Sequence, residues 1–237
     1  MLTVKFGYLA KGALIVAAAI LSSMAQAVTV PGTSDPWLAG MPDGSTASSG
    51  DIAPDQSPVL FTGFALTPGS WLNFAVTINP AAGPVGNCLG CTVPTPDGAG
   101  FYTHSPGPEN GISNVNAPLN SLLGVFLDAT QPSLSAAPSA MDFSTIGTDF
   151  PSLSPGLKQV FFIGDGVGAG NVVQTFLVPT GATRLYLGTM DGYGWWNNVG
   201  AYDVSVTAVP EPETYAMMLS GLGMLGLIAR RRKTPSR

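Results

Sequence analysis

The chain has 237 residues, of which 45% are hydrophobic and only 10% are charged, against roughly 25% charged residues in an ordinary soluble domain. One histidine and two cysteines are too few for a zinc site built from four Cys and His ligands. The formal net charge of −5 argues against a nucleic-acid-binding protein, because such proteins present basic surfaces to the phosphate backbone.

The first 27 residues have the pattern of a secretory signal peptide. Lys5 and Lys11 precede an apolar run over residues 13–21, and the small-x-small sequence Ala25-Gln26-Ala27 follows. We therefore expect cleavage after Ala27 and a mature chain that begins at Val28. A retained membrane anchor is the alternative, although the apolar run is shorter than the roughly 20 residues that a span needs.

The central part of the chain, residues 28–208, is acidic and is predicted to be one extracytoplasmic domain. Between Val28 and Val209 there are two basic and twelve acidic residues, a net charge of −10. The remaining basic residues flank the apolar runs near the two ends of the chain, which is the pattern that orients a protein in a membrane. With the C-terminal basic cluster in the cytoplasm, the acidic domain lies on the other side of the membrane.

This central part is predicted to be all-β. No stretch has apolar residues at helical spacing for three turns, and short β-rich runs alternate with Pro, Gly, Asn and Asp. Seven strands with long loops predict a jelly-roll-like β-sandwich, flanked by the signal helix and one C-terminal transmembrane helix. The seven runs are 59–66, 71–78, 119–127, 158–164, 172–178, 183–188 and 201–207.

The segments between these runs carry weaker expectations. Residues 28–58 are expected to wrap partly around the sandwich, and residues 112–117 and 131–154 to form short helices or coil. The glycine-rich segment 164–170 resembles a dinucleotide-binding loop, but that loop needs a following helix, whereas a strand follows here. We therefore expect a hairpin tip at residues 164–170.

Cys88 and Cys91 form a Cys-x-x-Cys pair. In an exported protein such a pair most simply closes a small disulfide loop. A redox-active pair would normally open a helix in a βαβ unit, and a zinc ribbon would need two further cysteines.

The segment 191–202 contains the residue types that calcium prefers. Calcium binds six to eight oxygens, and this turn supplies the Asp191 carboxylate, the Asn197 and Asn198 amides, and carbonyls beside Gly192 and Gly194. The glycines would let the backbone curl so that these oxygens converge. The alternative is that Asp-Gly and Asn-Asn are ordinary turn residues.

Together with residues 178–188, this segment resembles the last hairpin of galactose-binding-like jelly rolls, and in particular the bacterial galactophilic calcium lectins. The resemblance implies that Asp191, Asn197 and Asn198 are calcium ligands. It also implies that the turn 79–84 brings the Ala82 carbonyl to the ion. The spacing in the 191–198 turn is one residue shorter than in those lectins.

In those lectins the ion holds two sugar hydroxyls and a histidine from a separate loop touches the sugar. The resemblance therefore implies a carbohydrate site that includes His104, with Asn110 and the ring of Trp195 beside it. Three alternatives remain open. His104 is a solvated loop residue; one of Trp195 and Trp196 belongs to the core, since successive side chains of a strand point in opposite directions; or the ion is a structural clip and the domain binds no sugar.

The C-terminal segment has three parts in a fixed order. Pro210-Glu211-Pro212 lies within an opening motif at 209–213, residues 215–229 are apolar or small, and a basic end at 230–237 begins with Arg230, Arg231 and Arg232. A helix of 15 residues is about 22 Å long, near the thickness of a hydrocarbon core of about 30 Å.

This tripartite segment resembles the PEP-CTERM sorting signal of Gram-negative bacteria. That resemblance implies an exosortase as partner, a transient inner-membrane intermediate, removal of the tail, and delivery to the cell surface or the extracellular polysaccharide matrix. A plain single-pass anchor is the alternative, but it would not account for Pro210-Glu211-Pro212.

The sequence thus predicts an exported surface protein that binds extracellular polysaccharide with the help of Ca²⁺ and has no nucleic-acid partner. The alternative is a structural matrix or envelope protein without a ligand. Catalysis is not expected, since there is no Gly-x-Ser-x-Gly motif and His104 is the only imidazole. A glycosidase would require two suitably spaced carboxylates, and twelve acidic residues are available in the domain.

Overall fold

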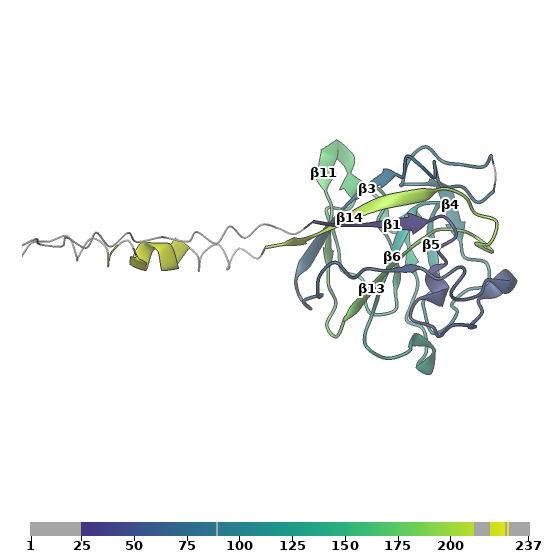
Figure 1. Ribbon diagram of the computed structural model, residues 1–237, viewed down its shortest axis with the longest axis horizontal. Helices are drawn as coiled ribbons and strands as arrows, with labels where there is room; N and C mark the ends of the chain where they lie inside the picture. The colour runs from purple at the N-terminus through teal and green to yellow at the C-terminus, as the bar shows by residue number, and fades with distance from the viewer. Residues whose placement is uncertain (1–24, 89, 211–218, 226, 228–237) are drawn as a thin grey trace, which may run out of the picture.

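The computed structural model describes residues 25–88, 90–210, 219–225 and 227. The predicted signal peptide lies outside the described residues apart from its last three, and so do much of the predicted span 215–229 and the basic end. Residues 219–225 are helical (Figure 1). Within the part of the chain that the structure describes, no helix has the length and apolar character needed to cross a membrane.

The first layer of the domain is a five-stranded sheet in the order β1-β14-β3-β12-β8. Neighbouring strands are antiparallel except for the parallel pair β12 and β8. β14, the second strand of this order, pairs with the edge strand β1 on one side and with the central strand β3 on the other (Figure 1). The strands are β1 (Gln26–Pro31), β3 (Trp71–Ile78), β8 (Ser152–Leu153), β12 (Thr175–Leu177) and β14 (Ala201–Val209).

The alternating sequence of β14 explains its place in this sheet. Tyr202, Val204 and Val206 are fully buried, whereas Asp203, Ser205 and Thr207 on the opposite face are only partly covered. β-Branched and aromatic residues with this period suit a sheet that has one face on the core. On the outer face, Asp203 accepts hydrogen bonds from Thr29 Oγ1 (2.7 Å) and Asn79 Nδ2 (2.8 Å), which link the three neighbouring strands.

The second layer is a four-stranded antiparallel sheet in the order β2-β13-β6-β9. All six residues of β6, from Leu122 to Leu127, are buried, which agrees with its nearly continuous apolar sequence. Aromatic rings fill the space between the layers, and Phe161 lies 5.2 Å from Phe126 and 5.7 Å from Phe176, measured between ring centroids. The strands are β2 (Val59–Leu60), β6 (Leu122–Leu127), β9 (Val160–Phe162) and β13 (Arg184–Thr189).

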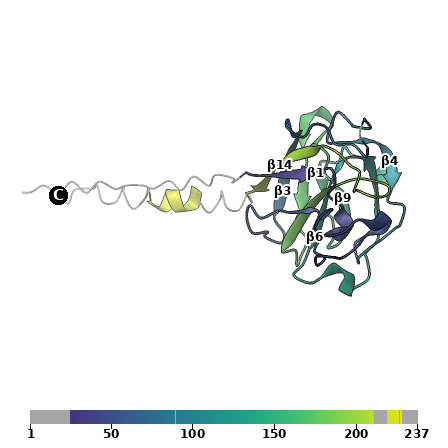
Figure 2. The same ribbon diagram turned by 45° about the vertical axis from the view of Figure 1, so that its right-hand side comes forward.

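Smaller elements cover the sandwich (Figure 2). A three-stranded sheet has the order β4-β5-β7, and β10 and β11 form a two-stranded hairpin. The strands are β4 (Ala99–Thr103), β5 (Val115–Leu119), β7 (Met141–Asp142), β10 (Val167–Gly168) and β11 (Val172–Val173); the helices are α1 (Phe143–Ile146), η1 (Pro36–Leu38), η2 (Ser48–Gly50), η3 (Pro132–Leu134) and η4 (Ala169–Asn171).

The two ends of the sandwich differ in what they carry. We call "tail end" the end at which β1 begins and β14 finishes, where Gln26 pairs with Val206 and Val209 pairs with Trp71. We call "loop end" the opposite end, where Pro31 pairs with Ala201 and Thr189 N–H donates to the Ser34 carbonyl at 3.0 Å. Much of the long segment between β1 and β2 lies at the loop end, away from the last residues of β14 (Figure 1).

The all-β prediction is confirmed, and β3 has the predicted bounds. The run 119–127 is two strands, because Asn120 adopts a positive φ of 65° and turns the chain between β5 and β6. The run 172–178 also divides, into β11 and β12 around the buried Gln174, whose Nε2 donates to two carbonyls of the preceding loop. The hairpin predicted at 164–170 is present as β10 with β11.

Four expectations, three for segments outside the seven runs and one for a run itself, were wrong in detail. Residues 26–31 form an edge strand, β1, where only a wrapping segment was expected, and residues 115–119 form β5 where a loop was expected. The predicted strand 59–66 contains only the two residues of β2. The strand β4 was missed because its sequence, Ala-Gly-Phe-Tyr-Thr, has no alternation and all five residues are exposed.

Phe161→Ala should lower the free energy of unfolding by about 3–5 kcal/mol, because the removed ring lies between two others in a closely packed core. Urea unfolding of the purified exported protein measures the change. Leu134→Ala is the control, since Leu134 is 78% exposed and its truncation should change the unfolding free energy by less than about 0.5 kcal/mol. Equal losses in the two variants would contradict the described core.

Candidate functional site

The loop end contains a group of buried polar and aromatic side chains. Three segments meet there: the one between β1 and β2, the one that follows β4, and the turn between β13 and β14. Asp35, Asp51 and His104 are at most 1% exposed, and Asp191 and Asn198 are 6% exposed. Buried polar residues in such number are unusual for a domain core and make this end the candidate site.

Three rings hold the interior of this site. His104 stacks on Trp37 with ring centroids 3.6 Å apart, and Trp195 lies 5.4 Å from Trp37 and 5.5 Å from His104. Both indole nitrogens donate to backbone carbonyls, Trp37 to Ser113 (3.0 Å) and Trp195 to Thr189 (2.9 Å). Each indole therefore buries its apolar body and still has its N–H satisfied.

Burial lowers the pKa of His104, although the neighbouring Glu109 opposes this effect. His104 Nε2 lies 2.9 Å from Glu109 Oε2, while the buried Nδ1 has no hydrogen-bond partner. A neutral ring with its proton on Nε2 satisfies this arrangement, since Nε2 then donates to the carboxylate. Glu109 also accepts from the backbone N–H and hydroxyl of Ser48, so it joins the two loops.

Asp35 and Asp51 form a pair of buried carboxyl groups that hydrogen-bond to each other. Both oxygens of Asp51 already accept backbone N–H groups, from Trp195 (2.8 Å) and Trp196 (3.1 Å). Asp35 Oδ1 accepts from Trp37 N–H at 2.8 Å, and no donor faces Asp35 Oδ2. Two carboxyl groups can share a hydrogen bond only when one of them carries a proton. We assign this proton to Asp35 Oδ2, because no donor faces that oxygen, whereas both oxygens of Asp51 already accept N–H groups.

Burial raises the pKa of Asp35 well above its usual value, and the nearby Asp51, Glu109 and Asp191 add to the rise. Burial also raises the pKa of Asp51 and of Asp191. Neither basic residue of the domain neutralises these acids. Lys158 Nζ donates to Ser135 and Ala136, and the Arg184 guanidinium donates to the carbonyls of Asp128 and Thr130.

The turn between β13 and β14 has two faces. Asp191 accepts from its own turn, including the Tyr193 N–H at 3.3 Å, and its side chain is hydrogen-bonded to Asn198. Asn198 Nδ2 donates to the Gly32 carbonyl at 3.0 Å, while its buried Oδ1 has no donor. On the outer face, Trp196 is 64% exposed and Tyr193 is 60% exposed.

Of the predicted calcium ligands, the structure brings Asp191 and Asn198 together, whereas the side chain of Asn197 is exposed. Ala82 lies in the separate turn 79–84, where its N–H donates to Asn79 Oδ1. Among the described residues there is no group of three or more His, Cys, Asp or Glu side chains arranged to hold a metal ion. The two assembled residues supply fewer oxygens than calcium takes.

The predicted sugar-contacting residues need correction. Trp195 is fully buried and His104 is 1% exposed, so neither ring offers a face to a ligand. Trp195 and Trp196 lie in a turn closed by the hydrogen bond from Asn198 N–H to the Trp195 carbonyl (3.1 Å), and it is Trp196 that points outward, with 64% of its surface exposed. Asn110, with a positive φ of 49°, donates from Nδ2 to the carbonyls of Trp37 (3.0 Å) and Thr46 (3.2 Å), and thus fastens loops together.

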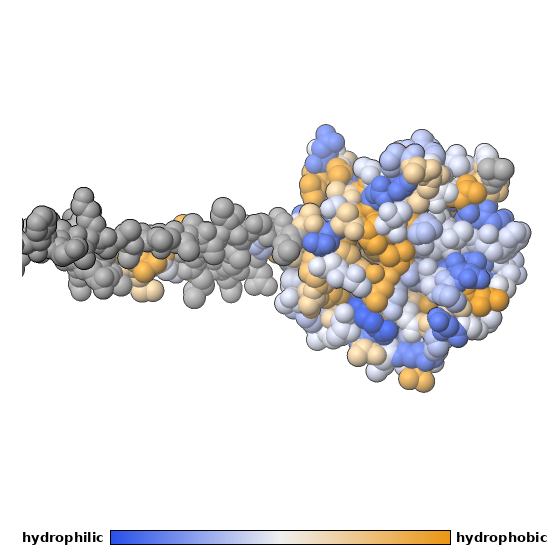
Figure 3. All heavy atoms as spheres, viewed as in Figure 1, coloured by the Kyte–Doolittle hydropathy of each residue, from blue (hydrophilic) through white to orange (hydrophobic). Residues whose placement is uncertain are grey.

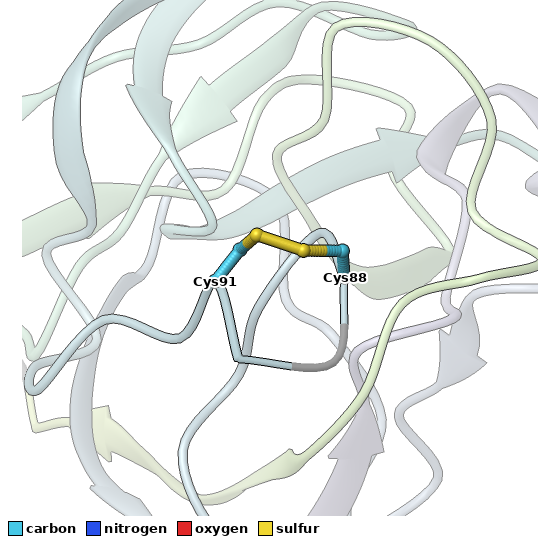
Figure 4. Close-up of a disulfide and its surroundings, with 2 residues drawn as sticks. All are labelled: Cys88 and Cys91. Carbon is cyan, nitrogen blue, oxygen red and sulfur yellow. A yellow bond between two sulfur atoms is a disulfide. The ribbon is translucent and has the colours of Figure 1, made fainter.

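The disulfide between Cys88 and Cys91 is confirmed (Figure 4). It closes a small loop next to Gly86, which pairs with Val199 two residues before β14. The disulfide thus lies beside the 191–200 turn, in a structural position.

Sequence reasoning missed Asp35, Asp51 and Trp37, which lie in the segment expected only to wrap the sandwich. One local signal is present: Asp35 precedes Pro36 and caps η1, as an Asp before a first-turn proline often does. The partner of Asp35 lies 16 residues further along, and the partner of Asp51 is the Trp195–Trp196 backbone. These long-range contacts have no signature in a single sequence.

Comparison with known proteins addresses the end of the chain. Residues 208–233 match the family described as the PEP-CTERM protein-sorting motif. The tail thus has the features of a PEP-CTERM sorting motif. It begins within β14, two residues before Pro210, and it implies an exported protein that an exosortase processes. Nothing among curated proteins or solved structures matches the chain.

Asp35→Asn should stabilise the domain near pH 7 by about 1–3 kcal/mol. The amide keeps the oxygen that accepts from Trp37 and donates to Asp51 without requiring a proton. The wild type has a raised folded pKa at Asp35, so its stability should fall as the pH rises from about 4 through that pKa. The variant should lose the part of this dependence that Asp35 contributes and keep the part due to Asp51 and Asp191. Urea unfolding between pH 4 and pH 8 measures both effects.

Asp51→Asn is the matched control, for which we expect the opposite change in stability. Both Asp51 oxygens accept backbone N–H groups, so an amide would place one N–H against another donor. This variant should be less stable than the wild type at pH 7. A stabilised Asp51→Asn, or a destabilised Asp35→Asn, would contradict the proton position described above.

Proposed function

We propose that this protein is an exported, exosortase-sorted surface protein whose loop end binds carbohydrate without catalysis. The observation that carries the binding proposal is the position of Trp196 and Tyr193. Both rings are mostly exposed, both lie on the 191–200 turn, and that turn lies at the end of the sandwich opposite the sorting motif. A flat aromatic face with polar groups nearby suits a sugar ring, which has both apolar C–H faces and hydroxyls.

The turn that carries these two rings is well anchored, which supports a binding role. Asp51 accepts the N–H groups of Trp195 and Trp196, and the buried Trp195 ring packs on Trp37. Gly194, with φ of +85°, passes so close to Ser49 that a side chain there would clash. A rigid loop loses little conformational entropy when a ligand binds, which favours affinity.

We further propose that the domain is related to galactose-binding-like jelly rolls and that calcium assists sugar binding. Any calcium dependence would involve Asp191 and Asn198. Their side chains are in contact, and no donor faces the Oδ1 atom of Asn198. Calcium would supply a positive charge to sugar hydroxyls. This chain's own residues would orient the sugar through the Trp196 and Tyr193 rings.

The test of carbohydrate binding uses glycan arrays and isothermal titration with the purified exported protein. Trp196→Ala should weaken binding at least tenfold, because the exposed ring would supply most of the stacking surface, while Leu134→Ala should leave affinity unchanged. A chelator should lower affinity only if calcium takes part. Absence of binding to every glycan and to the organism's own polysaccharide would favour the alternative of a structural protein without a ligand.

The sorting part has its own test. Replacing Glu211 and Pro212 together with Ala should leave the full-length chain in the inner membrane, because the motif that the exosortase reads is lost. Fractionation and mass spectrometry of the C-terminus measure this. Normal release of the double variant would argue against exosortase processing, whereas loss of carbohydrate binding alone would leave the sorting proposal intact.

A further inference from the structure

The edge of β14 changes when the signal peptide is removed. β1 pairs with β14 from Pro31 opposite Ala201 to Gln26 opposite Val206. Cleavage after Ala27, as the sequence predicts, leaves Val28 opposite Val204 as the first pair. Residues 205–209 of β14 then keep β3 on one side and have no β1 residue on the other.

The direction of the backbone groups on this edge follows from the hydrogen bonds at the loop end. Gly200 offers its carbonyl to Gly32 beside β1 (2.9 Å), and Ala201 offers its carbonyl to Asn79 beside β3 (2.9 Å). Successive residues of a strand point their backbone groups to opposite sides. The N–H and C=O groups of Val206 and Ala208 therefore face the side that β1 leaves open.

This open edge is continuous with the sorting motif. The match to the PEP-CTERM family starts at Ala208, so the first two matched residues are the last two of β14. Pro210 follows the last paired residue, Val209, directly. An enzyme that reads the motif therefore meets it as the extension of a strand with unpaired backbone groups on one side.

We infer that the exosortase binds this segment by strand addition: an extended segment of the enzyme pairs with the open edge of β14 at Val206 and Ala208. Exposed sheet edges recruit partner strands through main-chain hydrogen bonds. The inference rests on the signal-peptide cleavage predicted above and on the sorting function that the motif implies.

The surroundings of the edge suit an added strand. Gly63, which is exposed, passes so close to the Gln26 side chain that a side chain at position 63 would clash with it, and removal of Gln26 leaves that space open. Hydrophobic residues gather on the face shown, near the place where β1 and β14 lead toward the tail (Figure 3). The alternative, in which the end of β14 separates from β3, would expose the fully buried Val206 and break the pairing at residues 205–209.

Two proline substitutions one residue apart distinguish these modes in the full-length chain, expressed with its exosortase. Ala208→Pro removes an N–H that faces the open edge, and Val209→Pro removes one that faces β3. Pulse-chase analysis of tail removal should show Ala208→Pro slowed about fivefold or more, as expected for one lost hydrogen bond. Val209→Pro should remain within about twofold of the wild type. Equal slowing, or faster processing of Val209→Pro with no effect of Ala208→Pro, would overturn strand addition.

A second variant leaves residues 208–233 unchanged. If the signal-peptide cleavage site is moved so that the mature chain begins at Met24, Gln26 remains paired with Val206 and covers part of the edge. Tail removal should then be several-fold slower than in the wild type, and an unchanged rate would overturn the proposal. Failure of the wild type itself to be processed would overturn the sorting function along with it, which separates the two outcomes.

Discussion

The pairing of β14 on both sides is the interaction on which the rest of the structure depends. β3 pairs with residues 202–209 of this strand and β1 with residues 201–206, and its inward side chains fill the core between the two sheets. One end of β14 continues from the turn that carries Trp196, and the other end becomes the sorting motif. The strand thus places the surface that we propose binds carbohydrate at the end of the sandwich opposite to the residues where the matched motif begins.

The structure of the loop end is stabilised by different interactions. Its acids are buried without a basic partner: burial favours the protonated form of Asp35, and backbone N–H groups point at Asp51. A buried unpaired charge is costly, whereas a protonated carboxyl group hydrogen-bonds at much smaller cost. The same contacts hold the Trp195–Trp196 backbone in place, so the polar interior positions the exposed aromatic surface.

Sequence patterns predicted the elements that are determined by residues close together in the sequence. The alternation over residues 201–207, the turn residues around 71–78 and the Cys88–Cys91 spacing each correspond to a feature of the structure. The patterns failed where tertiary contacts decide. β1 is a strand because β14 offers it an edge, and β4 is a strand because β5 does. Trp195 and Trp196 could be divided between core and surface in principle, but only the structure shows which is which.

Because β1 and β14 are antiparallel neighbours, both ends of the folded body leave from one side. After the leader and the tail are cut, a protein joined to a lipid, a polymer or a reporter through its new C-terminus would be held by that side alone. The opposite pole would then point away from the attachment in every copy. A dense layer of such molecules would expose a uniformly oriented outer surface of tryptophan and tyrosine rings.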